Sequence, residues 1–440
     1  MSGSDTVAFG KPMRDHFLLA KDYLPLNHGS FGTYPKSIRD DLHKWQDLSE
    51  AKPDTFLRYD YPKALQSARE AMASFLDVPA HEVVFLQNTT TGINTVLRSL
   101  VFEQGDVILH FSTLYGACEK TMEYICETTP AESASVMLEY PVGDDEVVAK
   151  FAEALEKLNA DGNKVRVAIF DTISALPGVV VPWEKLVETC REHGVLSLVD
   201  GAHGVGHIEL NLGRAQPDFF ASNCHKWLYV PRGCAVFYVP ERNQHLIRTS
   251  LPTSHGFIPV PREGSQAIYN PLPPSMGTPF TNLFAYVATI DNSPYLCIEE
   301  ALRFRKDICH GEEAIRQYCN NLAVIGGRRM AEILDTDVME EAGNSKRCCF
   351  ANVRLPITLG SGESEVNEKD AVKVAQWIAE KLAMEYDAYI AIYIHGGKFW
   401  TRLSTQIYLD LEDIERGAKV LKVLCERVVR GDHIGILPLR

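Results

Sequence analysis

The chain has 440 residues, of which 45% are hydrophobic and 23% are charged. This length is about three times that of a typical single domain, so at least two domains with a substantial core are expected. The formal net charge of −14 argues against nucleic acid or an anionic membrane as partner, because either would require a basic surface.

No segment has the roughly 20 apolar residues that a membrane helix needs, and residues 1–14 lack the pattern of a secretory signal. The 11 cysteines show neither metal-ligand spacing nor a C-x-x-C motif, which is typical of reduced thiols. We therefore expect a cytoplasmic protein without a metal site.

Residues 1–61 are predicted to be irregular with a short helix and to hold two loops, at 26–32 and 52–59. From residue 62 onward, stretches with helical spacing alternate with short apolar runs. Near-continuous apolar strands separated by helices favour a parallel or mixed sheet that is covered on both faces. This α/β domain is expected to span 62–295, with helices at 64–76, 92–102 and 183–193 and strands at 82–86, 106–111, 165–170, 195–199, 218–221 and 234–238.

Residues 296–440 differ in character and predict a smaller α+β C-terminal domain. The spacing of apolar residues predicts one long amphipathic helix and two shorter ones. The expected helices lie at 298–333, 368–386 and 411–429, and the expected strands at 348–354 and 389–394.

Asp200 and Lys226 each follow an apolar strand. Because the carboxyl ends of parallel strands share one edge of a sheet, these two side chains can converge on one cleft. An aspartate there can keep a pyridine nitrogen protonated, and a lysine can form an imine with an aldehyde, which together are the requirements of pyridoxal phosphate. Taken alone, an aspartate at this position is more often a helix cap, and a lysine beside a tryptophan is more often a surface residue. Their joint occurrence with His203 and His225 favours the cofactor.

The segment 88–92, Asn-Thr-Thr-Thr-Gly, lies between a predicted strand and a predicted helix. Its N–H groups and hydroxyls can face a phosphate at the helix N-terminus, although a simple helix cap would use the same residues. By contrast, Gly201, Gly204 and Gly206 have the order G-x-x-G-x-G, which is not the dinucleotide pattern G-x-G-x-x-G. This order argues against a nicotinamide-dependent dehydrogenase, the alternative that sheet architecture alone would allow.

An amino-acid substrate needs a cation for its carboxylate, and a guanidinium group binds a carboxylate through two parallel hydrogen bonds. Arg402 is the first candidate, although many strand arginines only make ion pairs. Arg58 on the second N-terminal loop is another candidate. Asn27 and His28 on the first loop are expected to contact substrate as well.

Together, Val199-Asp200-Gly201-Ala202-His203 and Asn223-Cys224-His225-Lys226-Trp227 resemble the class V aminotransferase group of fold-type I pyridoxal-phosphate enzymes, in particular its isopenicillin-N-epimerase-like branch. The resemblance covers nearly the whole chain and implies a homodimer with shared active sites. It implies that Lys226 carries the cofactor as a Schiff base and that Asp200 pairs with the pyridine nitrogen.

The same resemblance implies further contacts to the ring and the phosphate of the cofactor. It places His203 near the ring, Tyr115 on the ring face, Ser174 near the ring oxygen, Thr90, Thr91, Asn223 and His225 at the phosphate, and Thr289 at the phosphate of the partner subunit.

The reaction implied by this resemblance passes through a carbanion (quinonoid) at the Cα of an amino acid. Two fungal types are similar to this chain: a Mannich-type cyclase of loline biosynthesis and a carbon–sulfur lyase of ergothioneine biosynthesis, the latter at 56–59 and 115–118. The lyase type has His-Arg-Arg-Arg where this chain has His395-Gly396-Gly397-Lys398. Smaller side chains there predict a more open, less basic pocket, which favours loline-type cyclisation in secondary metabolism. The lyase is the alternative, and an epimerase, an aminotransferase or an inert cofactor binder is less favoured.

Overall fold

The computed structural model describes residues 7–434, except 254, 258, 261, 265–272, 274–276, 340–346 and 363–364. At its centre lies a seven-stranded sheet in the order β2-β8-β7-β6-β5-β3-β4. Strand β8 runs antiparallel to both of its neighbours, and all other neighbours are parallel. The predicted mixed, mostly parallel sheet is confirmed; its strands are β2 (Val83–Leu86), β3 (Asp106–Phe111), β4 (Glu132–Val136), β5 (Lys164–Asp171), β6 (Leu196–Asp200), β7 (Phe219–Asn223) and β8 (Ala235–Tyr238).

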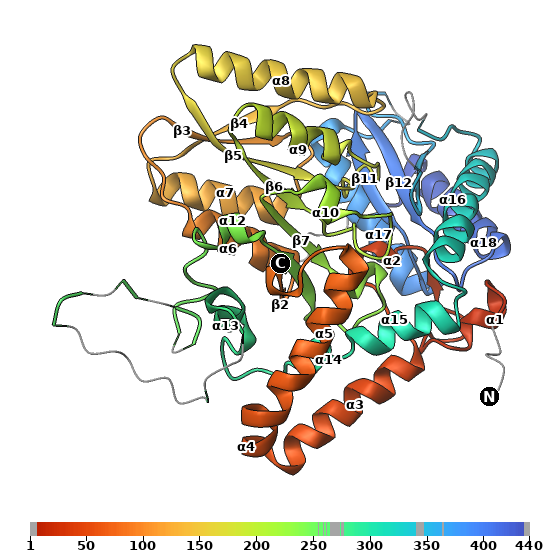
Figure 1. Ribbon diagram of the computed structural model, residues 1–440. Coiled ribbons are helices and arrows are strands. Elements are labelled where there is room, and N and C mark those ends of the chain that lie inside the picture. The colour runs from red at the N-terminus through yellow and green to blue at the C-terminus, as the bar shows by residue number, and fades with distance from the viewer. Residues whose placement is uncertain are drawn as a thin grey trace.

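Helices cover both faces of this sheet (Figure 1). One face packs against α6 (Thr89–Ser99), α7 (Gly116–Thr128) and α13 (Pro279–Ala285). Because successive strand residues point to opposite faces, the continuous apolar runs in the sequence reflect burial on both sides. The other face packs against α5 (Tyr61–Leu76), α8 (Asp144–Ala160) and α9 (Trp183–Glu192).

The C-terminal part contains a separate antiparallel sheet in the order β11-β12-β9. Helices α16, α17 and α18 pack on it and on one another. Its elements are β9 (Phe350–Arg354), β11 (Ala391–His395), β12 (Lys398–Ser404), α16 (Glu312–Leu334), α17 (Ala371–Tyr386) and α18 (Leu411–Val429). The N-terminal segment joins this part, since β1 (Leu24–Pro25) pairs with β10 (Ala388–Tyr389).

The remaining helices of the described chain include α3 (Lys36–Ala51), which has 16 residues, and two short helices where a loop was predicted at 52–59. They are α1 (Lys11–Arg14), α2 (His28–Phe31), α3, α4 (Pro53–Thr55), a π-helix (Phe56–Asp60), α10 (Leu212–Ala215), α11 (Cys224–Trp227), α12 (Glu241–Gln244), α14 (Ser293–Leu296), α15 (Ile298–Asp307) and 3₁₀ turns at Ala80–Glu82 and Glu368–Asp370. Among the described residues, no helix combines the length and the apolar character that a membrane crossing demands.

The prediction of one helix at 298–333 is wrong. The chain forms α15 and α16, because His310 and Gly311 between them have φ angles of 60° and 90°, which no α-helix contains. Three strands were also missed: β1 is only two residues long, β4 is a largely exposed edge strand with little apolar character, and β12 carries charged residues among its apolar ones. The domain boundaries expected near 61 and 295 stay a prediction.

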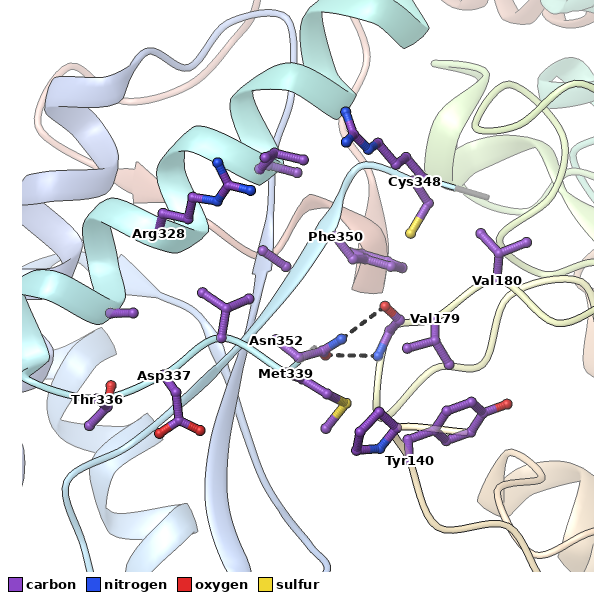
Figure 2. Close-up of a pocket in the computed structure, with 18 of the residues that line it drawn as sticks. Tyr140, Val179, Val180, Arg328, Thr336, Asp337, Met339, Cys348, Phe350 and Asn352 are labelled. Atoms are coloured by element: carbon purple, nitrogen blue, oxygen red, sulfur yellow. Dashed lines mark hydrogen bonds between the residues drawn. The ribbon is translucent and has the colours of Figure 1, made fainter. Parts of the chain in front are cut away.

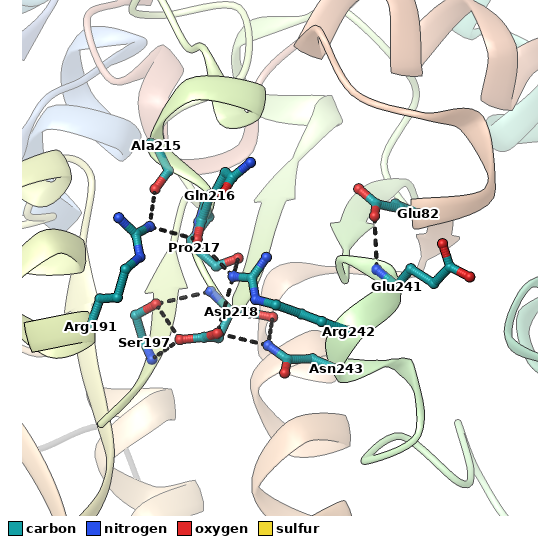
Figure 3. A network of polar contacts seen from close by, with 10 residues as sticks. All are labelled: Glu82, Arg191, Ser197, Ala215, Gln216, Pro217, Asp218, Glu241, Arg242 and Asn243. Carbon is teal, nitrogen blue, oxygen red and sulfur yellow. Dashed lines mark hydrogen bonds and ion pairs between the residues drawn. The ribbon is translucent and has the colours of Figure 1, made fainter. Parts of the chain in front are cut away.

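A polar network closes the amino ends of β6 and β7 (Figure 3). Asp218 accepts hydrogen bonds from the N–H and the hydroxyl of Ser197 at 3.0 and 3.1 Å. Its other oxygen lies 2.7 Å from Asn243 and 3.1 Å from Arg242. The polar groups of this network are thus hydrogen-bonded to one another at the amino edge of the sheet.

The contact between α6 and the sheet depends on Gly92. A Cβ at this position would stand 2.7 Å from the Cβ of Ala221 on β7. We expect Gly92→Ala to lower the free energy of unfolding by about 1–3 kcal/mol, because α6 must move off the sheet. Gly116→Ala at the start of α7 meets no atom within 4 Å and is the matched control. Equal urea midpoints for both variants would contradict this packing.

Candidate active site

A cavity of about 660 Å³ opens at the carboxyl edge of the large sheet. Strands β5, β6 and β7 end there with Asp171, Asp200 and Asn223, as expected for a parallel sheet, where such ends share one edge. Seven of the residues predicted from the sequence line this cavity: Thr90, Tyr115, Asp200, His203, Asn223, His225 and Lys226.

Lys226 lies on α11, directly after β7, and its amine faces His203. The Lys226 Nζ is 3.2 Å from the Nε2 of His203, whose Nδ1 accepts a hydrogen bond from the indole N–H of Trp227 at 3.2 Å. A neutral His203 with an accepting Nδ1 carries its proton on Nε2, so Lys226 can accept that proton only as an unprotonated amine. Burial, followed by the charge of Arg402, lowers the pKa of Lys226 to about 8. Burial also holds the pKa of His203 well below its usual range.

Asp200 is buried, with 2% of its surface exposed. One carboxyl oxygen accepts a hydrogen bond from the N–H of Ala202 at 2.8 Å, and the other accepts from the thiol of Cys118 at 3.2 Å. Burial raises the pKa of Asp200, whereas these two hydrogen bonds and the charge of Lys226 oppose that rise. Cys118 lies on α7 and was not predicted as part of the site, because a cysteine within a helix gives no signal in the sequence.

Asp171 is a second carboxyl group that the sequence reasoning missed. It ends β5, pairs in register with Asp200 and lines the cavity. Burial, followed by the charge of Asp200, raises the pKa of Asp171 well above its usual range, which favours the protonated form of this carboxyl group. Asp171 could have been predicted from the sequence, because it is a carboxyl residue at the end of an apolar run.

The start of α6 contributes Thr89 and Thr90 to the cavity wall. The Thr89 N–H donates to Asn223 at 3.0 Å, and its buried hydroxyl has no partner among the described residues. Thr91 instead donates both its N–H and its hydroxyl to Asn88 and does not line the cavity. A free buried hydroxyl at a helix N-terminus fits an anionic oxygen such as that of a phosphate. Thr89, which the sequence reasoning missed, is the residue placed to meet it.

Of the remaining predicted cofactor contacts, Tyr115 and His225 line the cavity, and Ser174 and Thr289 do not. Tyr115 precedes α7 and is about half exposed, and His225 lies beside the Cys234 carbonyl at 3.3 Å. Burial, followed by the charge of Lys226, lowers the pKa of His225 to about 4. Ser174 is fully buried outside the cavity wall with an unpaired hydroxyl, and Thr289 also lies outside that wall.

Arg402 stands directly behind the cavity wall, on β12. It donates to the carbonyl of Ala175 at 2.6 Å, to Asn27 Oδ1 at 3.0 Å and to Ser30 Oγ at 3.4 Å. Its guanidinium lies 4.3 Å from the ring centre of Phe350. Burial lowers the pKa of Arg402 to about 10, so it remains charged at neutral pH.

The other predicted substrate contacts do not line the cavity. The carboxamide of Asn27 is held by Arg402, and His28 bonds to the main-chain carbonyl of Lys226. Arg58 lies on the π-helix and pairs with Asp54 at 3.1 Å. Within the single chain, these residues therefore support the site from behind or lie away from it.

The argument from residues 395–398 is wrong. These residues form the β11–β12 turn, in which Gly396 and Gly397 have φ angles of 54° and 66°. A tight hairpin of this kind requires positive φ at both positions, which explains the two glycines. His395 accepts a hydrogen bond from the N–H of Tyr140 at 2.8 Å, and none of the four residues lines the cavity.

A second cavity, of about 750 Å³, lies between α16, β9 and the loops near Tyr140 and Val179 (Figure 2). At its floor, Asn352 exchanges two hydrogen bonds with the main chain of Gly178, at 2.9 and 3.0 Å. Neither Lys226 nor its carboxyl neighbours reach this space, so the smaller cavity is the candidate active site.

Residues 57–331 match the family model described as aminotransferase class-V. The chain is 40% identical to the L-cysteine desulfhydrase-like protein lolT1 of Epichloe uncinata, over 97% of this chain and 98% of that protein. It is 30% identical to the hercynylcysteine sulfoxide lyase of Schizosaccharomyces pombe, over 96% and 99%. The solved complex of the cystine C–S lyase C-DES with cysteine persulfide shares the fold, with a TM-score of 0.73, 19% identity and coverage of 92% and 98%.

The lowered pKa of Lys226 can be measured by reductive methylation of the protein. Only an unprotonated amine reacts, so we expect labelling of Lys226 to rise through a midpoint near pH 8 and not near the ordinary value of 10.5. Arg402→Met removes a charge that disfavours protonation and should move the midpoint to higher pH, whereas Asp200→Asn should move it lower. Peptide mass spectrometry gives the midpoints, and identical midpoints in all three proteins would contradict the assigned charges.

Proposed function

We propose, from the premise that the chain belongs to the class V aminotransferase family of pyridoxal-phosphate enzymes, that it removes a proton from the Cα of an amino-acid substrate. The observation that carries this proposal is the amine of Lys226 in one cavity with Asp200 and neutral His203. When bound, pyridoxal phosphate supplies an aldehyde for a lysine and a pyridine ring that draws electrons from Cα.

Three side chains have the main proton-handling roles in this proposal. Lys226, whose lowered pKa of about 8 gives a larger unprotonated fraction near neutral pH than an ordinary lysine has, attaches the cofactor and serves as the base at Cα. Asp200 would hold a proton on the pyridine nitrogen; burial raises its pKa, but two hydrogen bonds and the Lys226 charge oppose that rise and support its ionised form. His203 directs its Nε2 toward the amine of Lys226 and fixes its orientation.

The phosphate of the cofactor fits the start of α6. Thr89 and Thr90 line the cavity there, and the Thr89 hydroxyl is unpaired among the described residues; Asn223, which accepts a hydrogen bond from the Thr89 N–H, and His225 line the same cavity. Tyr115 is placed at the mouth to cover the ring. We also propose a homodimer, in which Thr289, which does not line the cavity of its own chain, contacts the phosphate of the second copy.

The carboxylate of the substrate is assigned to Arg402. This residue keeps its charge at neutral pH and bonds Ala175 and Ser30, both of which line the cavity. An entering carboxylate would compete with Asn27 for the Arg402 Nη2. Binding would therefore also shift the N-terminal segment that carries Asn27.

Two fates of the reacting Cα are candidates. Loline-type cyclisation, which the sequence comparison of residues 395–398 favoured, forms a carbon–carbon bond at Cα; the relative lolT1, at 40% identity, is described as L-cysteine desulfhydrase-like. Cleavage of a carbon–sulfur bond is supported equally, because the related Schizosaccharomyces pombe protein is a sulfoxide lyase. The residues of the turn at 395–398 do not distinguish cyclisation from carbon–sulfur cleavage, since they do not line the cavity.

Turnover in deuterated water tests the proposed function and separates these fates. Lys226→Ala should lower deuterium incorporation at Cα by about 10²–10⁴-fold, because the base is lost. Lys185→Ala removes an exposed, ion-paired lysine and should leave the rate unchanged. Pyruvate released from a cysteine conjugate identifies the lyase, and a carbon-linked product without sulfur release identifies the cyclase. Full turnover in Lys226→Ala, with unchanged visible absorbance, would contradict the proposal.

A further inference from the structure

The helix that carries Lys226 is unusually short. Helix α11 contains only Cys224–Trp227, so its last carbonyl groups cannot all be paired within the helix. The N–H groups of Leu228 and Val230 both turn back to the carbonyl of Cys224, at 3.2 and 3.4 Å. The carbonyl groups of the following residues need partners from elsewhere in the chain.

Distant side chains supply these partners. The carbonyl of Lys226 accepts a hydrogen bond from the Nε2 of His28, and the carbonyl of Trp227 accepts one from Arg305 at 2.7 Å. The N-terminal segment packs closely on α11: a Cβ at Gly32 would overlap the carbonyl oxygen of His225. The position of Lys226 is therefore set by residues outside its own helix.

His28 is itself held in one orientation. A carbonyl only accepts, so the Nε2 of His28 carries the proton, and the Nδ1 accepts the hydroxyl of Tyr408 at 2.8 Å. The imidazole is 4% exposed and packs on Trp227 with ring centres 5.2 Å apart. Burial lowers the pKa of His28 to about 3, so this neutral form persists at neutral pH.

We propose that His28, fixed by Tyr408, is a positioning residue that sets where the Lys226 amine stands in the cavity. This inference rests on the proposed role of Lys226 as the cofactor lysine. It replaces the expectation that His28 contacts substrate, since His28 touches the main chain of Lys226 and does not line the cavity. It also links Lys226 to the segment after β12, in which Tyr408 lies.

The test uses the holoenzyme and three substitutions. His28→Leu removes both hydrogen bonds, His28→Gln keeps a donor for the Lys226 carbonyl, and Tyr408→Phe removes only the support of the imidazole. Tyr229→Phe is the matched control, because it deletes another buried hydroxyl that bonds to Gln406. The measurements are the dissociation constant of pyridoxal phosphate, the pH midpoint of its visible absorbance, and the melting temperature.

We expect His28→Leu to raise the dissociation constant by about tenfold and to shift the pH midpoint, whereas His28→Gln stays within about threefold of the parent. Tyr408→Phe should shift the midpoint, and Tyr229→Phe should not. If His28→Leu does not fold, the pH midpoints of Tyr408→Phe and Tyr229→Phe are compared: a shift in Tyr408→Phe alone supports the inference, and equal midpoints contradict it.

Two outcomes overturn the inference: a lower melting temperature with unchanged cofactor affinity and midpoint in every His28 and Tyr408 variant, or equal losses in His28→Leu and His28→Gln. Failure of the proposed function would look different. In that case, Lys226→Ala itself would bind pyridoxal phosphate with the absorbance of the parent.

Discussion

The close approach of one amine and two carboxyl groups at the edge of a buried sheet is the constraint on which this site depends. Burial disfavours each charge, so the groups must pair or become neutral. Burial raises the pKa of both carboxyl groups, but Ala202, Cys118 and Lys226 oppose that rise at Asp200, whereas the charge of Asp200 adds to it at Asp171. The same burial leaves Lys226 with an amine that loses its proton readily. The chemistry of the site thus follows from how the fold compensates for desolvation.

Other parts of the chain hold this arrangement in place. The N-terminal segment contributes His28 to the main chain of Lys226 and Asn27 to Arg402. The antiparallel sheet contributes Phe350, which packs on the Arg402 guanidinium and on the ring of His203. The cavity therefore draws on three regions that are far apart in the sequence, and binding of a carboxylate at Arg402 would affect all of them.

Much of this site was predictable because parallel strands end at a common edge, which places Asp200 and Lys226 together from the sequence alone. The sequence could not show which way a side chain turns within a short segment, so Thr91 was chosen where Thr89 faces the cavity. Cys118 was missed because its role depends on tertiary packing. The break between α15 and α16 was missed because apolar spacing continues across it, although Gly311 marks it.

The assignment of the cofactor to one lysine can be tested on the purified holoenzyme. Borohydride reduction fixes pyridoxal phosphate permanently to the lysine that holds it, and peptide mapping by mass spectrometry then identifies that residue. The structure predicts a single pyridoxyl label on the peptide containing Lys226, at the carboxyl edge of the sheet beside Asp200. A label on any other lysine, or a fully loaded enzyme that gains no label, would contradict this account.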